Sequence, residues 1–94
     1  MHHYLAVLVP LQEGGWHAHF PDFPGCRAEG RTVEAAIDAS ICAITRHART
    51  IVDQGEALPT PQTFEELRHE SSGWAAERGI DWGNAVMNLV RLSV

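Results

Sequence analysis

The sequence predicts an α+β domain with the element order β-β-β-α-(short α)-β. Two alternating apolar segments flank the turn residues at positions 13–15, which predicts an antiparallel hairpin. From residue 32 the apolar residues recur at spacings of three and four, which predicts a long helix, and residues 85–94 are again strand-like. At 94 residues the chain is expected to be a single domain, 1–94, with a long helix packed on the sheet.

Residues 4–9 are apolar and β-branched enough for a first strand. Pro10 ends it, and Glu13, Gly14 and Gly15 supply a turn before alternation resumes at residue 16. With the turn near residues 11–14, one face of the hairpin should carry Leu5, Val7, Val9, Trp16, Ala18 and Phe20. The other face should carry Tyr4, Ala6, Leu8, His17 and His19.

That second face is unusually apolar for a solvated surface. We therefore expect a partner or a second copy to cover part of it. The residues predicted for this self-interface are Tyr4, Leu8, His17 and His19.

A double-proline corner follows the hairpin. Each proline fixes φ and removes an N–H, so two prolines three residues apart forbid a regular strand or helix. Pro24 and Gly25 fit positions i+1 and i+2 of a type II turn, and Asp22 is expected to hydrogen-bond its own backbone. A short strand should return through residues 26–29. The structural motif comprises Phe20, Pro21, Asp22, Pro24, Gly25, Cys26, Gly30 and Thr32.

The long helix should begin after Thr32, whose side chain can cap it, and end before Gly55 at the C′ position. It should span about six turns. Its apolar positions, which we expect to face the sheet, are Val33, Ile37, Ile41, Ile44, Ala48, Ile51 and Val52.

The last third of the chain carries weaker signals. Pro59 and Pro61 predict an extended connector, and Thr63 with Glu66 predicts a capping box for a short helix through about residue 68. We divide the domain into residues 1–61, a short helix and irregular segment over 62–84, and a strand over 85–94. Residues 69–84 are expected to be irregular or partly helical, with two tryptophans packing on the body or on a neighbour. The final strand is apolar on both parities, as is typical of an interior strand.

Charge favours a basic partner. Twelve Asp and Glu against seven Lys and Arg give a net charge of −5, and no basic cluster could follow a phosphate backbone. Direct DNA binding is therefore not expected. The partner interface is predicted at the acidic stretch and its aromatic neighbours, Glu65, Glu66, Glu70, Trp74, Glu77 and Trp82.

The sequence offers no signal peptide and no membrane-length apolar segment, and its two cysteines lack metal-ligand spacing, so a cytoplasmic protein is expected. His17 and His19, joined by His2 or His3, could suggest a metal, but no Cys, Asp or Glu completes a ligand set. Asp22 could act as an acid or a metal ligand, although its turn role is favoured. No nucleophile motif or phosphate loop occurs, so neither catalytic residues nor cofactors are predicted.

The hairpin, the corner through Cys26, Gly30 and Thr32 at the helix start, and then Gly55, Pro59 and Pro61 together resemble the HicB family of antitoxins. The resemblance covers residues 4–61 and a final strand near 86–92. Arg31 and Ala35 depart from the family's pattern, because acidic residues are common at both positions. The resemblance implies a partial RNase H-like fold and a non-enzymatic role, the binding and blocking of a small basic HicA-type mRNA-cleaving toxin.

Because the second face of the hairpin is so apolar, we also expect a homo-oligomer, a dimer or a tetramer. Many family members append a DNA-binding segment, and no such motif can be built from the residues after 84. Two alternatives remain open. One is an oligomeric binding or scaffold domain without a toxin, and the other is a residual RNase H-like nuclease, for which the first strand, residues 4–9, lacks the expected carboxylate.

Overall fold

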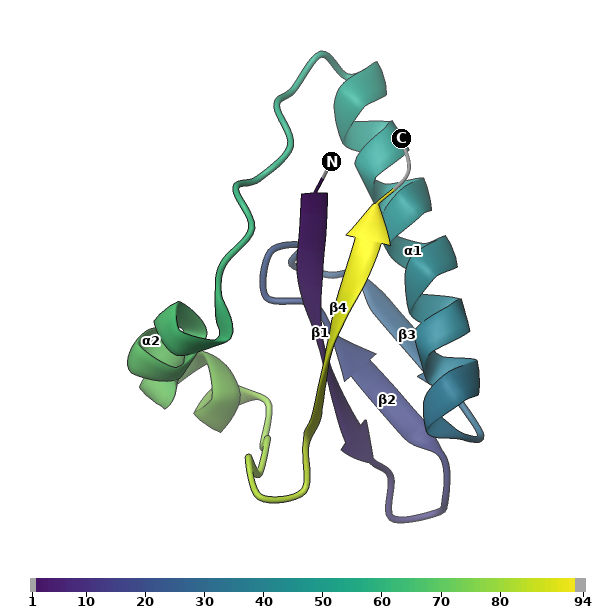
Figure 1. Cartoon of the computed structure of the whole chain (residues 1–94), viewed down its shortest axis with the longest axis vertical. Helices are drawn as coiled ribbons and strands as arrows, with labels where there is room; N and C mark the ends of the chain where they lie inside the picture. The colour runs from purple at the N-terminus through teal and green to yellow at the C-terminus, as the bar shows by residue number, and fades with distance from the viewer. Residues whose placement is uncertain (1, 93–94) are drawn as a thin grey trace.

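The computed structural model describes residues 2–92, with the side chains of residue 2 and of residues 68–72 excepted. Its elements follow the predicted order (Figure 1). They are β1 (His2–Pro10), β2 (Trp16–His19), β3 (Arg27–Gly30), α1 (Val33–Asp53), α2 (Phe64–Glu77) and β4 (Val86–Leu92). The α+β prediction is therefore confirmed.

The four strands form one antiparallel sheet in the order β3-β2-β1-β4. In Figure 1, α1 lies on one side of this sheet and α2 on the other, so the domain has three layers. We name the two sides of the sheet the α1 face and the α2 face. Each face has its own apolar cluster, which explains why β1 and β4 are apolar on both parities.

The register of the hairpin differs by one residue from the prediction. Val7 pairs with His19 and Leu8 with Ala18. The cause is the turn: the Gly14 N–H donates to the Leu11 carbonyl at 3.0 Å, and residues 11–15 form a loop between the paired residues 10 and 16. An odd number of loop residues pairs strand positions of the same parity, and a one-residue slip moves every side chain to the other face.

Tyr4 and Leu8 consequently lie on the α1 face, not beside His17 and His19. Both are fully buried, with 0% of their surface exposed, in the cluster that contains Ile44 of α1. The prediction that Tyr4 and Leu8 form a self-interface is therefore wrong, because α1 already covers them. His17 and His19 lie on the α2 face with Val7 and Val9.

Helix α1 begins as predicted. The Ala35 N–H donates to Oγ1 of Thr32 at 3.1 Å, and Gly55 follows the C-cap with φ of +77°. The stripe that the sheet buries runs at intervals of four along the helix, through Ala36, Ser40, Ile44 and Ala48. Ile41 and Val52, which the periodicity placed in this stripe, are 42% and 47% exposed.

The double-proline corner forms the predicted type II turn. The Cys26 N–H donates to the Phe23 carbonyl at 3.0 Å, and Gly25 has φ of +86°. Asp22 differs from its prediction, because its carboxylate accepts the Gln62 N–H at 3.3 and 3.4 Å instead of bonding its own backbone. The corner thus anchors the connector between the helices, 40 residues further along the chain.

Helix α2 extends to Glu77, well beyond the predicted end near residue 68, so the first part of the segment expected to be irregular or partly helical is helical. The predicted capping box is confirmed: the Glu66 N–H donates to Thr63 Oγ1 at 3.1 Å, and the Thr63 N–H donates to Glu66 Oε1 at 3.2 Å. Burial of Leu67 and Ala75 stabilises a helix that contains the weak helix formers Ser71, Ser72 and Gly73.

Candidate partner-binding surface

Two stacked tryptophans connect α2 to the sheet. The rings of Trp74 and Trp82 lie 6.3 Å apart at 27°, and both pack against the cluster of Leu5, Val7 and Leu67. The sequence left packing on the body or on a neighbour open, and the structure shows packing on the body. Because both are half-buried, these tryptophans support α2 as well as contributing to its outer surface.

The predicted acidic residues lie on the outside of this layer. Glu65, Glu66 and Glu77 are exposed, whereas the side chain of Glu70 lies outside the described part of the chain. Glu66 is engaged in the capping box, and Glu77 Oε2 lies 3.7 Å from Nη1 of Arg78. Of these three carboxylates, that of Glu65, in the first turn of α2, makes no hydrogen bond or ion pair with the described residues.

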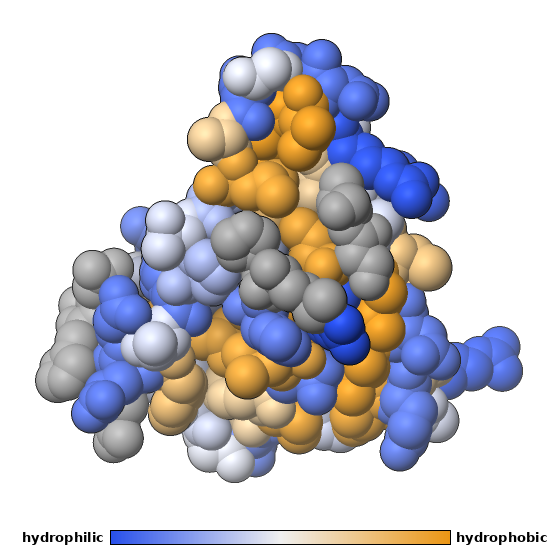
Figure 2. Space-filling view, turned by 45° about the horizontal axis from the view of Figure 1, so that its top comes forward, coloured by the Kyte–Doolittle hydropathy of each residue, from blue (hydrophilic) through white to orange (hydrophobic). Residues whose placement is uncertain are grey.

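An apolar groove of about 460 Å³ runs between the start of α2 and the sheet. It is lined chiefly by His3, Leu5, Pro61, Phe64, Met87 and Leu89. Leu89 is 60% exposed and Phe64 is 39% exposed, so apolar atoms of the groove face solvent. Figure 2 shows hydrophobic surface gathered in the middle of this view, between hydrophilic surfaces on both sides.

This groove was not predicted from the sequence. The sequence feature that relates to the groove is the apolar character of both sides of β4. We had predicted from this feature that β4 is an interior strand. The sheet order shows that β4 is instead an edge strand. Its side chains are apolar on both sides because both faces of the sheet are covered, but the covering of the α2 face is incomplete at Leu89.

His17 and His19 occupy a second pocket, of about 290 Å³, on the α2 face. Their rings lie 4.5 Å apart, and Nδ1 of His17 lies 3.2 Å from Oε1 of Glu29 on β3. Arg78 covers the ring of Trp74 at 4.9 Å and also lines this pocket, next to Arg27. The predicted role of the two histidines in a self-interface stays a prediction.

The pKa of His19 is lowered to about 4. Burial is the largest cause, and the positive charges of His17, Arg78 and Arg27 add to it. His19 is therefore neutral at physiological pH and can bond as a neutral imidazole. Among the described residues, no three His, Cys, Asp or Glu side chains lie together as a metal site would require.

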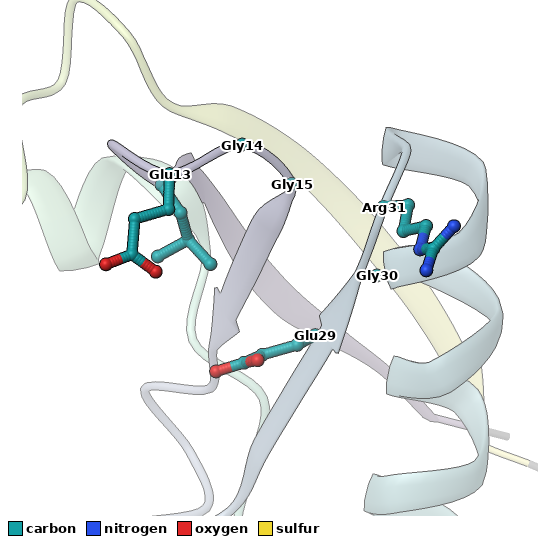
Figure 3. Close-up of a pocket in the computed structure, with 7 residues that line it drawn as sticks. Glu13, Gly14, Gly15, Glu29, Gly30 and Arg31 are labelled. Carbon is teal, nitrogen blue, oxygen red and sulfur yellow. The ribbon is translucent and has the colours of Figure 1, made fainter.

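A third pocket lies at the tip of the hairpin. Figure 3 shows Glu13 and Glu29 extending to one side of it, whereas Arg31 lies next to α1. Its floor is backbone: a Cβ on Gly15 would lie 3.0 Å from the Gly30 carbonyl oxygen. Gly30 and Gly15 serve close packing here, which accounts for Gly30 in the structural motif without a ligand.

The surroundings of Asp22 favour a structural role over a role as an acid or a metal ligand. It is 9% exposed, and burial is the largest cause of its raised pKa; the Gln62 N–H lowers this pKa and the charge of Glu66 raises it. Asp22 does not line the pocket of His17 and His19 beside the corner, and no acidic side chain of the described residues does. The position of Asp22 fits a structural anchor.

Comparison with known proteins identifies the family. The model of the "HicB_like antitoxin of bacterial toxin-antitoxin system" matches residues 4–91. Antitoxin HicB 1 of Photorhabdus laumondii subsp. laumondii is 31% identical over 58 residues, which cover 62% of this chain and 37% of that protein. The chain thus spans little more than a third of this relative.

Solved structures agree on the fold. The N-terminal domain of Burkholderia pseudomallei antitoxin HicB gives a TM-score of 0.76 at 26% identity, covering 99% of this chain and all, 100%, of that one. A toxin–antitoxin complex from Streptococcus pneumoniae gives 0.77 at 16% identity, covering 98% of this chain and 69% of that one. The HicA3 and HicB3 toxin–antitoxin complex gives 0.68 at 21% identity, covering 99% and 100%. The chain therefore belongs to the HicB-like antitoxin family of bacterial toxin–antitoxin systems.

Proposed function

We propose that this chain is an antitoxin that binds a small basic HicA-type mRNA-cleaving toxin and neutralises it by covering the toxin's RNA-binding or catalytic face. The observation that carries the proposal is the surface formed by α2 and the groove, where exposed carboxylates flank exposed apolar side chains. Protein interfaces combine an apolar centre with a polar rim in this way. The matches to the HicA3 and HicB3 complex and to a toxin–antitoxin complex from Streptococcus pneumoniae support the choice of partner.

Charge supports the same pairing. The chain carries a net charge of −5, and Glu65 and Glu77 are exposed on α2. An acidic surface attracts a basic protein over a distance of about 10 Å at 0.1 M salt and raises its association rate. A toxin surface that binds RNA must itself be basic. The acidic surface of this chain can therefore both attract the toxin and compete with RNA for the toxin's basic surface.

We infer a binding role without catalysis. The nuclease alternative requires a carboxylate on the first strand, and the sequence of His2–Pro10 contains none. Asp22 is engaged with the Gln62 N–H, 3.3 Å away.

No helix of the described residues is long and apolar enough to span a membrane. We place the pairing in the cytoplasm, where mRNA is translated.

The proposal is tested with the protein encoded by the adjacent small basic open reading frame. Co-expression and purification through a tag on either protein should recover a complex. The purified neighbour should cleave mRNA, and one equivalent of this chain should stop the cleavage. Absence of a complex with the neighbour would contradict the proposed function.

The alternative of an oligomeric scaffold has a separate test. Light scattering on the purified chain measures whether it forms the expected dimer or tetramer. An oligomer that neither binds the neighbour nor slows its cleavage of mRNA would favour the scaffold. A complex that forms with the neighbour but leaves cleavage unchanged would contradict neutralisation while preserving the pairing.

A further inference from the structure

The two edges of the sheet differ in their protection against further strand pairing. Edge strands usually avoid pairing by being short and by carrying charges. β3 has both properties, because it is only 4 residues long and includes Arg27 and Glu29. β4 is 7 residues long, contains no proline, and has Arg91 as its one charged residue. β4 thus lacks the usual protection.

The apolar groove lies directly beside this unprotected edge. Met87 and Leu89 of β4 line it together with Leu5 of the neighbouring strand β1, and Leu5 pairs directly with Leu89. Pro61 and Phe64 form its opposite wall. An extended segment added to β4 would place every second side chain, roughly 7 Å apart, on the groove side of the sheet.

We propose that an extended segment of the basic toxin adds to the outer edge of β4 as a fifth strand, with alternate apolar side chains in the groove. The inference deepens the proposed function and rests on it, since it names where and how the toxin binds. In this mode the backbone hydrogen bonds of the added strand supply affinity and the groove supplies selectivity for apolar side chains. Leu89, 60% exposed at the edge of the groove, would become buried.

Charge decides between the toxin and a second copy of this chain. Glu65 and Glu66 are exposed in the first turn of α2, next to Phe64 at the groove wall. Basic residues flanking the added strand would be attracted by both carboxylates. Two copies of a chain with a net charge of −5 repel each other, so self-pairing through β4 lacks this attraction.

The experiment compares amide hydrogen exchange in the free chain and in its complex with the neighbouring basic protein. We expect alternate amides of β4 to become protected in the complex, because only every second N–H of an edge strand points outward. Amides of β3 should exchange as before. Leu89→Asp should weaken binding about tenfold or more. Leu11→Asp is the control, since Leu11 is also an exposed leucine, at 38%, but lies at the hairpin turn.

Each outcome separates the two proposals. Binding by the wild type with unchanged β4 exchange, and with equal affinity for Leu89→Asp, would overturn the edge-strand inference and leave the proposed function standing. No binding by the wild type would contradict the proposed function itself. Protection of β4 that rises with concentration in the absence of the toxin would assign the edge to a second copy. Leu89→Ser repeats the test without an added charge if Leu89→Asp disturbs the fold.

Discussion

The phenol of Tyr4 donates a hydrogen bond of 2.7 Å to the carbonyl oxygen of Pro59, 55 residues away. Tyr4 is fully buried under α1, and its ring also meets Phe23 of the corner edge-on, with 4.6 Å between the ring centroids. This bond and the contact of Asp22 with the Gln62 N–H hold the connector that leads to α2. The position of the groove wall at Pro61 therefore depends on the hairpin and the corner.

Tyr4→Phe should destabilise the domain by about 1 kcal/mol, because a half-buried carbonyl loses its donor while the ring stays in place. For a domain of this size this corresponds to a fall in Tm of roughly 4–8 °C. Thermal unfolding followed by circular dichroism measures the fall. An unchanged Tm together with unchanged hydrogen exchange at the amides of Thr60, Gln62 and Thr63 would show that the bond does not restrain the connector.

Gly30→Ala should destabilise the domain by about 3 kcal/mol or more, because overpacking at a backbone contact cannot be relieved by a side-chain rotation. The added Cβ would lie 2.3 Å from the backbone nitrogen of Ala36 and 2.6 Å from the carbonyl carbon of Ala35. β3 and α1 would have to separate. Urea unfolding gives the free-energy change.

Gly73→Ala is the matched control for Gly30→Ala. Gly73 lies within α2, and a Cβ there meets no atom within 4 Å. Replacing Gly73 by alanine should stabilise the helix by up to about 1 kcal/mol. Equal effects of the two substitutions would refute the proposed role of the close contact at Gly30.

His19 should make the domain less stable as the pH falls from about 6.5 toward about 4, the lowered pKa of the folded state. In this range the unfolded chain binds a proton at His19 that the folded chain excludes, so acid favours unfolding. Above pH 6.5 His19 is neutral in both states and no longer lowers the free energy of unfolding. His19→Gln should reduce the difference in unfolding free energy between pH 5 and pH 7. An imidazole that titrates near 6.5 by NMR would contradict the burial argument.

Arg27→Gln should raise the pKa of His19 by only part of the difference between its lowered value and the ordinary value of 6.5. Burial is the main cause of the low value, and the charges of His17 and Arg78 remain after the substitution. The change is measured in the same NMR titration. Arg49→Gln is the control. Arg49 lies on α1 and lines a different pocket, so its substitution should leave the His19 titration unchanged.

Glu65→Gln should slow association with the toxin roughly two- to threefold at low salt, because one steering charge is lost beside the groove. Stopped-flow or surface-based kinetics at several salt concentrations measure the rate, and the difference should shrink as salt is added. Glu34→Gln is the matched control, since Glu34 holds the same first-turn position in α1. Equal slowing by both substitutions would indicate an effect of net charge and not of this surface.

Local chemistry made much of the fold predictable. Thr32 and Thr63 cap their helices, and Pro24 with Gly25 forms the turn that their conformational preferences require. The hairpin was predicted, but its register was not, because a single additional loop residue exchanges the two faces. The errors at Tyr4 and Leu8 follow from that one step. The length of α2 was missed because burial of Leu67 and Ala75 outweighs a weak helical sequence.

By itself, the sequence determined the order of elements, the helix starts and the corner, since each depends on neighbours within a few residues. The tertiary structure decided which face carries His17 and His19, that Asp22 anchors Gln62, and that β4 lies at an edge beside an apolar groove. These features depend on pairings between distant segments, whose geometry is fixed only when the strands assemble. Sequence pattern shows that β4 is apolar on both sides, and only the strand order shows that one of its edges is open.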